Sequence, residues 1–160
     1  MGDWIEAGER APAFTLTADD DAKVRLSDLK GQPAVLYFYP RDDTPGCTRE
    51  ACAFRDQQSQ LRKLGVRVLG ISTDSIESHG KFRDKYDLNF SLLSDPDHAV
   101  AEKYGAWREK NLYGKKSLGI QRSTFLIDAD GKVAKVWKAV KVDGHDAQVI
   151  AALGELKKMN

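Results

Sequence analysis

Both cysteines of the chain lie within one short stretch, TPGCTREAC, at residues 44–52. Cys47 and Cys52 are five residues apart, whereas a preformed redox pair or half of a zinc site usually has CxxC spacing. In a helix this separation places the two Cα atoms roughly 8.6 Å apart on different faces. A disulfide needs Cα atoms within about 7 Å. The spacing therefore favours a switch between a folded dithiol form and a locally unwound disulfide form.

Cys47 follows a pattern that predicts a reactive position. The run PAVLYFY at 33–39 indicates a buried strand, and the segment PRDDTPGC then leads into a helix that begins near Pro45. Thr44 is suited to the N-cap and Pro45 to the first helical position, which places Cys47 in the first turn. Backbone N–H groups and the helix dipole favour a thiolate there.

Nearby cations would support the same chemistry. Arg41 and Arg49 are candidates because they are close in sequence. Arg122 precedes another predicted strand, and its side chain could reach the same sheet edge if the two strands are neighbours. Glu50 could order the site through either Arg49 or Arg122.

The remaining elements predict a single α/β domain over residues 1–160 with a central mixed sheet. Asp95 is predicted as an N-cap with Pro96 at the first helical position, and Gly65 as a C-terminal cap. The segment 108–121 is the longest loop candidate. The expected strands are 66–72, 90–94, 123–128 and 132–140, the expected helices are 45–64, 75–87, 95–106 and 143–158, and an N-terminal hairpin is expected within 14–31.

The overall composition excludes several function classes. Lys and Arg number 25 against 24 Asp and Glu, so neither nucleic acid nor an anionic membrane is expected as a partner. No apolar run approaches the roughly 20 residues of a membrane span, and the N-terminus lacks a secretory signal, so a cytoplasmic location is expected. His79, His98 and His145 lack ligand spacing. They are expected at the surface or partly packed, with no metal site.

The active-site stretch resembles a known family. Pro40-x-x-x-Thr44-x-x-Cys47 is similar to the peroxiredoxin motif, and YFYPRDDTPGCTREACAFRD resembles the bacterioferritin comigratory, or Q-type, group. The similarity extends from GERAPAFTL through LLSDPDHAVAEKYGAW to RSTFLID. This resemblance implies a thioredoxin-like, three-layer α/β fold with an added N-terminal β-hairpin.

The resemblance also implies a role for each site residue. Cys47 would be the peroxidatic cysteine and Cys52 the resolving one. Thr44 would hold the peroxide or the thiolate through its hydroxyl group, and Pro40 would shield the site from water. Arg122 would support the thiolate and the leaving oxygen.

The implied activity is reduction of hydrogen peroxide and alkyl hydroperoxides, with recycling by thioredoxin or a similar dithiol reductant. No metal, haem, flavin or nicotinamide cofactor is implied, and the group suggests a monomer. Two alternatives remain open from the residues alone. A thiol–disulfide oxidoreductase would need a closely spaced pair, usually CxxC, which the chain lacks. A redox sensor or holdase would need a slow, stoichiometric thiol and an apolar patch that becomes exposed on unfolding.

Overall fold

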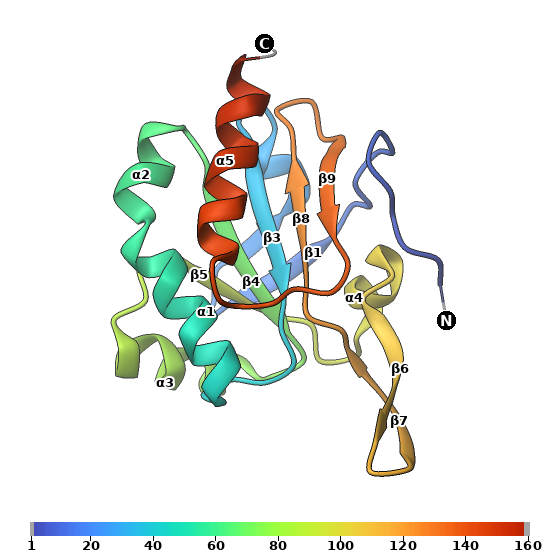
Figure 1. Ribbon diagram of the computed structural model, residues 1–160. Coiled ribbons are helices and arrows are strands. Elements are labelled where there is room, and N and C mark those ends of the chain that lie inside the picture. Colours follow the sequence, from blue (N-terminus) through green and yellow to red (C-terminus); the bar gives the residue numbers. More distant parts are fainter. Residues whose placement is uncertain (1, 159–160) are drawn as a thin grey trace.

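The structure is a computed structural model that describes residues 2–158, apart from the side chain of Leu112. It contains a central mixed sheet with helices on both faces (Figure 1). The strands are β1 Thr15–Ala18, β2 Lys23–Arg25, β3 Ala34–Phe38, β4 Arg67–Ser72, β5 Ser91–Ser94, β6 Trp107–Leu112, β7 Lys115–Ile120, β8 Ser123–Ile127 and β9 Val133–Trp137. The helices are η1 Leu26–Leu29, α1 Pro45–Asp56, α2 Gln58–Lys63, α3 Ile76–Tyr86, α4 Ala99–Tyr104 and α5 His145–Lys158.

The main sheet has the strand order β2-β1-β5-β4-β3-β8-β9. β3, β4 and β5 run parallel, while β8 pairs antiparallel with β3. The predicted N-terminal hairpin is present as β1 and β2, which extend the sheet beyond β5. This arrangement places β3, which leads into the cysteine-bearing helix, in the interior of the sheet.

The side chains of β3 alternate between two hydrophobic clusters, one on each face of the sheet. Leu36 and Phe38 pack with residues of α4 and η1 on one face. Val35 and Tyr37 pack with residues of α1, α2, α3 and α5 on the other. Every residue of β3 is buried, which is why its sequence is continuously apolar rather than alternating.

The predicted helix over 45–64 is divided in two. α1 ends at Asp56 and α2 begins at Gln58, with Gln57 at φ −96° and ψ 3° between them. Gly65 follows with φ +72°, in the left-handed conformation that suits a residue just after a helix end. α5 ends at Lys158, at the opposite end of the molecule from the first turn of α1 (Figure 1).

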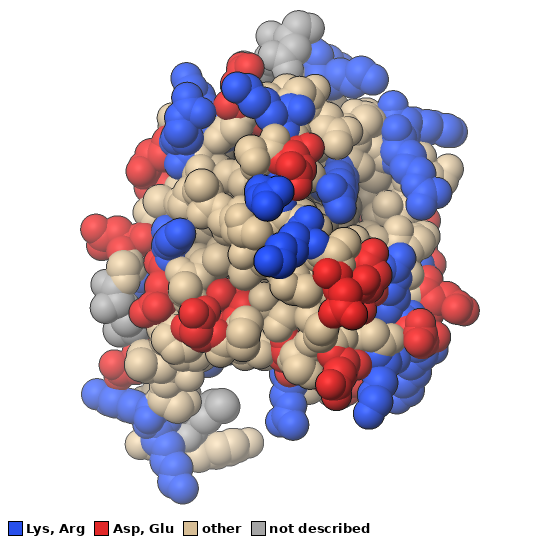
Figure 2. All heavy atoms as spheres, turned by 180° about the vertical axis from the view of Figure 1, so that it is seen from behind, with Lys and Arg blue, Asp and Glu red and all other residues tan. Residues whose placement is uncertain are grey.

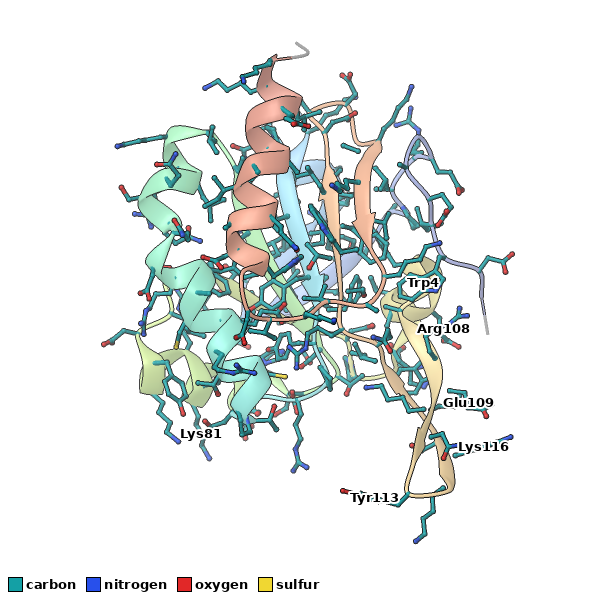
Figure 3. The ribbon with its side chains drawn as sticks, in the orientation of Figure 1. Trp4, Lys81, Arg108, Glu109, Tyr113 and Lys116 are labelled. Carbon is teal, nitrogen blue, oxygen red and sulfur yellow. The ribbon has the colours of Figure 1, made fainter. Side chains whose placement is uncertain are left out.

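The prediction of a loop over 108–121 is wrong. β6 and β7 pair antiparallel across this segment and form a hairpin that projects from the body. Its turn is Tyr113–Gly114, with φ of +54° and +78°, as a tight two-residue hairpin turn requires. Figure 3 shows Tyr113 at the tip, where its side chain is fully exposed. The hairpin lacks the apolar alternation of a half-buried strand because most of its residues are exposed on both faces.

The predicted start of the helix over 95–106 is also wrong. α4 begins at Ala99 with His98, at φ +52°, as its N-cap. The Asp95 carboxylate nevertheless accepts hydrogen bonds from the backbone N–H groups of Val100 (3.2 Å) and Ala101 (2.9 Å). Asp95 therefore caps the helix from outside it, because its own backbone N–H is bound to Ser72 O at the end of β4.

Charged side chains of both signs are interspersed over the face shown in Figure 2. On the hairpin, Lys116 lies 3.7 Å from Glu109, and the Arg108 guanidinium lies over the ring of Trp4 (Figure 3). Among residues 2–158, no helix combines the length and apolar character needed to cross a lipid bilayer.

Candidate active site

The site is built where β3 ends and α1 begins. In the antiparallel register Phe38 pairs with Ser123, so Arg122 lies beside the loop that follows β3. That loop turns at Asp43, which has φ +56°. The first backbone bond of the helix then runs from Thr48 N to Thr44 O at 2.8 Å. Adjacent strand ends therefore bring together two segments that are about 75 residues apart.

Cys47 lies in the first turn of α1 and is 1% exposed. One terminal nitrogen of Arg122 donates a hydrogen bond to Cys47 Sγ at 3.2 Å. The other binds Glu50 Oε1 at 2.7 Å. The planar guanidinium thus bridges a thiol and a carboxylate, an arrangement that a single ammonium group cannot reproduce. The predicted meeting of Cys47 and Arg122 is confirmed, and Arg122 rather than Arg49 is the partner of Glu50.

Burial dominates the electrostatics of Glu50. Desolvation raises the pKa of Glu50 to about 7, although the charge of Arg122 and its hydrogen bond act in the opposite direction. For Arg122, burial alone would lower the pKa, but Glu50 and Cys47 together raise it. Burial and the positive charge of Arg122 both lower the pKa of Lys110 on β6, while Cys47 opposes them. These groups share one electrostatic environment around the sulfur.

Tyr37 is a buried neighbour of Cys47 that the sequence did not single out. Its ring packs in the same cluster as Cys47, and burial together with the charge of Glu50 holds its pKa well above the usual range. A Cβ on Gly70, the partner of Tyr37 in β4, would lie 2.8 Å from the Tyr37 hydroxyl oxygen. The phenol therefore occupies space that only a glycine leaves open. We refer to Cys47, Arg122, Glu50 and Tyr37 as the thiol cluster.

Gly46 has a similar spatial requirement next to the thiol. A Cβ at this position would lie 3.1 Å from the Arg122 nitrogen that contacts Cys47. Glycine before the cysteine thus lets the guanidinium approach the helix closely enough to reach the sulfur. This accounts physically for the Pro-Gly-Cys order at the start of α1.

The other predicted site residues occupy less direct positions. Pro40 is half-buried in the bend after β3. Thr44 is the N-cap residue of α1 by backbone geometry, but its hydroxyl makes no cap bond and donates instead to Arg41 O at 2.9 Å. Cys52 is a half-buried free thiol further along α1. Its side chain is not part of the thiol cluster.

The alternative cations are not assembled around the sulfur. Arg49 is exposed and binds Asp143 at 2.8 Å, and Arg41 is also exposed. Neither residue has a hydrogen bond to Cys47 in the structure over residues 2–158.

The prediction that the histidines are at the surface or partly packed is wrong for two of them. His79 is 0% exposed and His145 is 2% exposed. Each is accommodated because its ring nitrogens have hydrogen-bond partners, Asp42 and Leu93 O for His79, and Thr124 and Gln148 for His145. Sequence alone carries no signal for Asp42, Leu93 and Thr124, because they come from other strands and loops, whereas Gln148 lies three residues from His145 in α5.

Comparison with known proteins gives the class of this site. The AhpC/TSA family matches residues 7–136, which is most of the chain. The chain therefore belongs to the AhpC/TSA family.

The similar curated proteins are peroxiredoxins. A putative peroxiredoxin bcp of Coxiella burnetii is 57% identical over 93% of this chain and 99% of its own length. Peroxiredoxin Bcp of Bacillus subtilis is 47% identical over 96% of this chain and 98% of its own length. The resemblance to the bacterioferritin comigratory, Q-type peroxiredoxins is thus confirmed.

Solved structures agree on the fold. A structure of the Xanthomonas campestris bacterioferritin comigratory protein, determined to study alkyl peroxide reduction, has a TM-score of 0.88 and 40% identity, covering 94% of this chain and 98% of that one. A Xylella fastidiosa PrxQ mutant has a TM-score of 0.90 and 34% identity, covering 99% of both chains. The predicted thioredoxin-like α/β fold is confirmed.

Proposed function

We propose that this chain is a thiol peroxidase that reduces hydrogen peroxide and alkyl hydroperoxides, with Cys47 as the peroxidatic cysteine. The observation that carries the proposal is the 3.2 Å hydrogen bond from Arg122 to a thiol buried in the first turn of α1. A thiolate accepts this bond more strongly than a neutral thiol does. The site thus presents a nucleophile together with a fixed positive charge.

The first step transfers one oxygen atom to Cys47. The thiolate sulfur attacks the nearer peroxide oxygen, the O–O bond breaks, and the leaving oxygen takes a proton to form water or an alcohol. Sulfur is oxidised to a sulfenic acid and the peroxide is reduced. Negative charge develops on the leaving oxygen, where the Arg122 guanidinium would stabilise it.

Thr44 and Pro40 would shape the space in which the peroxide reacts. The Thr44 hydroxyl donates a hydrogen bond to Arg41 O, so its oxygen lone pairs are oriented away from that bond and can accept a hydrogen bond from the peroxide. Pro40 has no N–H group and would exclude water from one side. Both residues come from the loop that ends at Pro45.

Cys52 would complete the oxidative half of the cycle. Its thiol attacks the Cys47 sulfenic acid, a disulfide forms and water leaves. Because both cysteines lie in α1, the first turns of this helix must unwind before the sulfurs can bond. A dithiol reductant, which we propose to be thioredoxin, would then restore both thiols by exchange. We further propose a monomeric enzyme, one domain over residues 1–160, that works in the cytoplasm.

One measurement tests this scheme directly. Reduced protein receives one equivalent of hydrogen peroxide, and its intact mass and non-reduced peptide map are recorded. We expect loss of two hydrogen atoms and a Cys47–Cys52 bridge. The Cys52→Ser variant should instead gain oxygen at Cys47 and stop after one turnover. An unchanged mass in the unmodified protein would contradict the peroxidase assignment, and normal cycling of Cys52→Ser with thioredoxin would remove Cys52 as the resolving residue.

A further inference from the structure

A second buried polar cluster lies just before the thiol cluster, and the proposed reaction does not use it. It is centred on Asp42, in the loop between β3 and α1. The Asp42 carboxylate accepts hydrogen bonds from Tyr39 OH at 2.6 Å and Ser78 Oγ at 2.8 Å, and it lies 2.7 Å from His79 Nδ1. The Asp42 backbone N–H donates to Asp74 Oδ2 at 2.8 Å. The loop is thus fixed at one residue by four contacts.

His79 links Asp42 to the central sheet. Its Nε2 lies 2.9 Å from the carbonyl oxygen of Leu93 in β5, and its ring is completely buried. Both ring nitrogens therefore have a partner, so the ring bridges Asp42 and the backbone of β5. His79 joins the active-site loop, helix α3 and strand β5 through buried hydrogen-bond contacts. We call Asp42, His79 and their partners Tyr39, Ser78 and Asp74 the hinge cluster.

The chain is much less firmly held on the other side of Asp42. The next residue, Asp43, has left-handed backbone geometry and binds Lys85 and Tyr86 at the surface, where Lys85 is largely exposed. The N-cap Thr44 contributes no side-chain bond to α1. Further along, the helix is interrupted at Gln57. Asp42 is firmly bound, and the helix after it is weakly capped. Local unwinding of α1 would therefore stop at Asp42.

We propose that the Asp42–His79 pair is the fixed hinge at which α1 unwinds, and that His79 is a positioning residue for the peroxide reaction. The effect of His79 on the peroxide reaction rests on the proposed function, whereas the hinge itself does not. While the hinge holds, the loop keeps Cys47 beside Arg122. Weakening the hinge would shift the population towards the unwound form, in which Cys52 can reach Cys47 but Arg122 no longer contacts the sulfur.

The test uses variants of the full chain at position 79. His79→Leu removes both ring nitrogens, whereas His79→Asn retains a donor near Nδ1, towards Asp42, and His79→Gln retains one near Nε2, towards Leu93. Three quantities are measured: the second-order rate constant of the reduced protein with hydrogen peroxide, the first-order rate of disulfide formation, and the fraction over-oxidised at high peroxide. For His79→Leu we expect a peroxide rate about tenfold lower, a disulfide rate several-fold higher and less over-oxidation.

Leu29→Ala serves as the matched control because Leu29 is buried in η1 on the other face of the sheet. It should lower stability without changing the ratio of the two rates. His79→Asn should lie closer to the unmodified protein than His79→Gln does. The proposal would be overturned if His79→Leu and Leu29→Ala changed the rates equally. It would also be overturned if the peroxide rate and the disulfide rate of His79→Leu fell together.

A readout without peroxide separates this hinge from the proposed function. Amide hydrogen exchange over residues 43–52 of the reduced protein should accelerate in His79→Leu about tenfold more than in Leu29→Ala. If the unmodified protein failed to react with peroxide, the proposed function would be wrong, and the exchange data would still decide the hinge. Unchanged exchange over 43–52 would reject the hinge even in an active enzyme. If His79→Leu does not fold, Asp42→Asn provides the same comparison, since it alters the carboxylate that contacts His79.

Discussion

One buried polar cluster lies in the loop before α1 and the other around its first turn, and the two differ in how completely their polar atoms are partnered. In the hinge cluster, both carboxylate oxygens of Asp42 and both ring nitrogens of His79 have partners. In the thiol cluster, Glu50 Oε2 and the Tyr37 hydroxyl have no hydrogen-bond partner among residues 2–158. These clusters are separated by only a few residues of loop.

The difference indicates that the hinge cluster serves stability and the thiol cluster serves reactivity. A fully partnered buried network fixes its surroundings in one arrangement. Buried polar atoms without partners cost stability, and native proteins concentrate them where function requires it. The thiol cluster keeps hydrogen-bonding capacity near the sulfur, where charge changes during the reaction. The hinge cluster keeps the loop in place while that change occurs.

The largest expected effect comes from removing the sulfur. Cys47→Ser should lower peroxide turnover by at least about a thousandfold, because no other group in the thiol cluster is a comparable nucleophile. Its folding should be little affected, since the hinge cluster is untouched. Peroxide consumption with excess reductant measures the first effect, and thermal unfolding measures the second. Turnover near that of the unmodified protein would show that Cys47 is not the reactive thiol.

The second effect concerns the bridge between thiol and carboxylate. Arg122→Lys should reduce kcat/KM for hydrogen peroxide about a hundredfold, because one ammonium cannot bind Cys47 and Glu50 with the same geometry. Arg49→Lys is the matched control, since Arg49 is exposed and forms its ion pair with the surface residue Asp143. We expect kcat/KM of Arg49→Lys to stay within about twofold of the unmodified protein. Similar losses of kcat/KM in both variants would indicate that the overall positive charge, rather than the contact of Arg122 with Cys47 and Glu50, supports the reaction.

The third effect is a dependence of stability on pH. The folded pKa of Glu50 is about 7, above the ordinary value of 4.5, so the folded state binds this proton more tightly than the unfolded state. The resulting stabilisation is complete below pH 4.5 and is lost as the pH rises through about 7. It amounts to about 3 kcal/mol.

Glu50→Gln should remove this dependence. Chemical denaturation of both proteins between about pH 4 and pH 8 isolates the contribution of Glu50, since other groups titrate in both. We expect the unmodified protein to lose stability relative to Glu50→Gln as the pH rises. Parallel curves would mean that Glu50 titrates normally in the folded protein.

The smallest effect tests the unpartnered phenol. Tyr37→Phe removes a buried hydroxyl that has no partner among the described residues, and should raise the free energy of unfolding by about 1 kcal/mol. Phenylalanine keeps the ring packing against Phe54. Urea denaturation at fixed pH measures the change. A loss of stability would show that the hydroxyl has a favourable interaction in solution, and would make the two clusters more alike.

The parts of the site that were predictable depend on local chemistry. The buried run of β3, the Thr44–Pro45 helix start and the position of Cys47 in the first turn follow from neighbouring residues alone. Arg122 was predictable because it precedes a recognisable strand, and the adjacency of β3 and β8 then determined its contact. The roles of Pro40, Thr44 and Cys52 came from the family resemblance and stay predictions.

The parts that were missed depend on contacts between distant segments. His79 looks like a surface residue in SIESHGKF, and only the fold supplies Asp42 and Leu93 as its partners. The β6–β7 hairpin lacks apolar alternation because the main sheet does not cover it. Asp95 has the composition of an N-cap, but its backbone bond to Ser72 holds it outside the helix.

The position of α5 has a practical consequence for handling the protein. Its C-terminal end at Lys158 lies at the far end of the molecule from the first turn of α1 (Figure 1). A tether attached beyond that end would orient Cys47 away from a solid support. The same attachment would leave the start of α1 accessible to a soluble reductant, so an immobilised form could be cycled repeatedly between its two redox states.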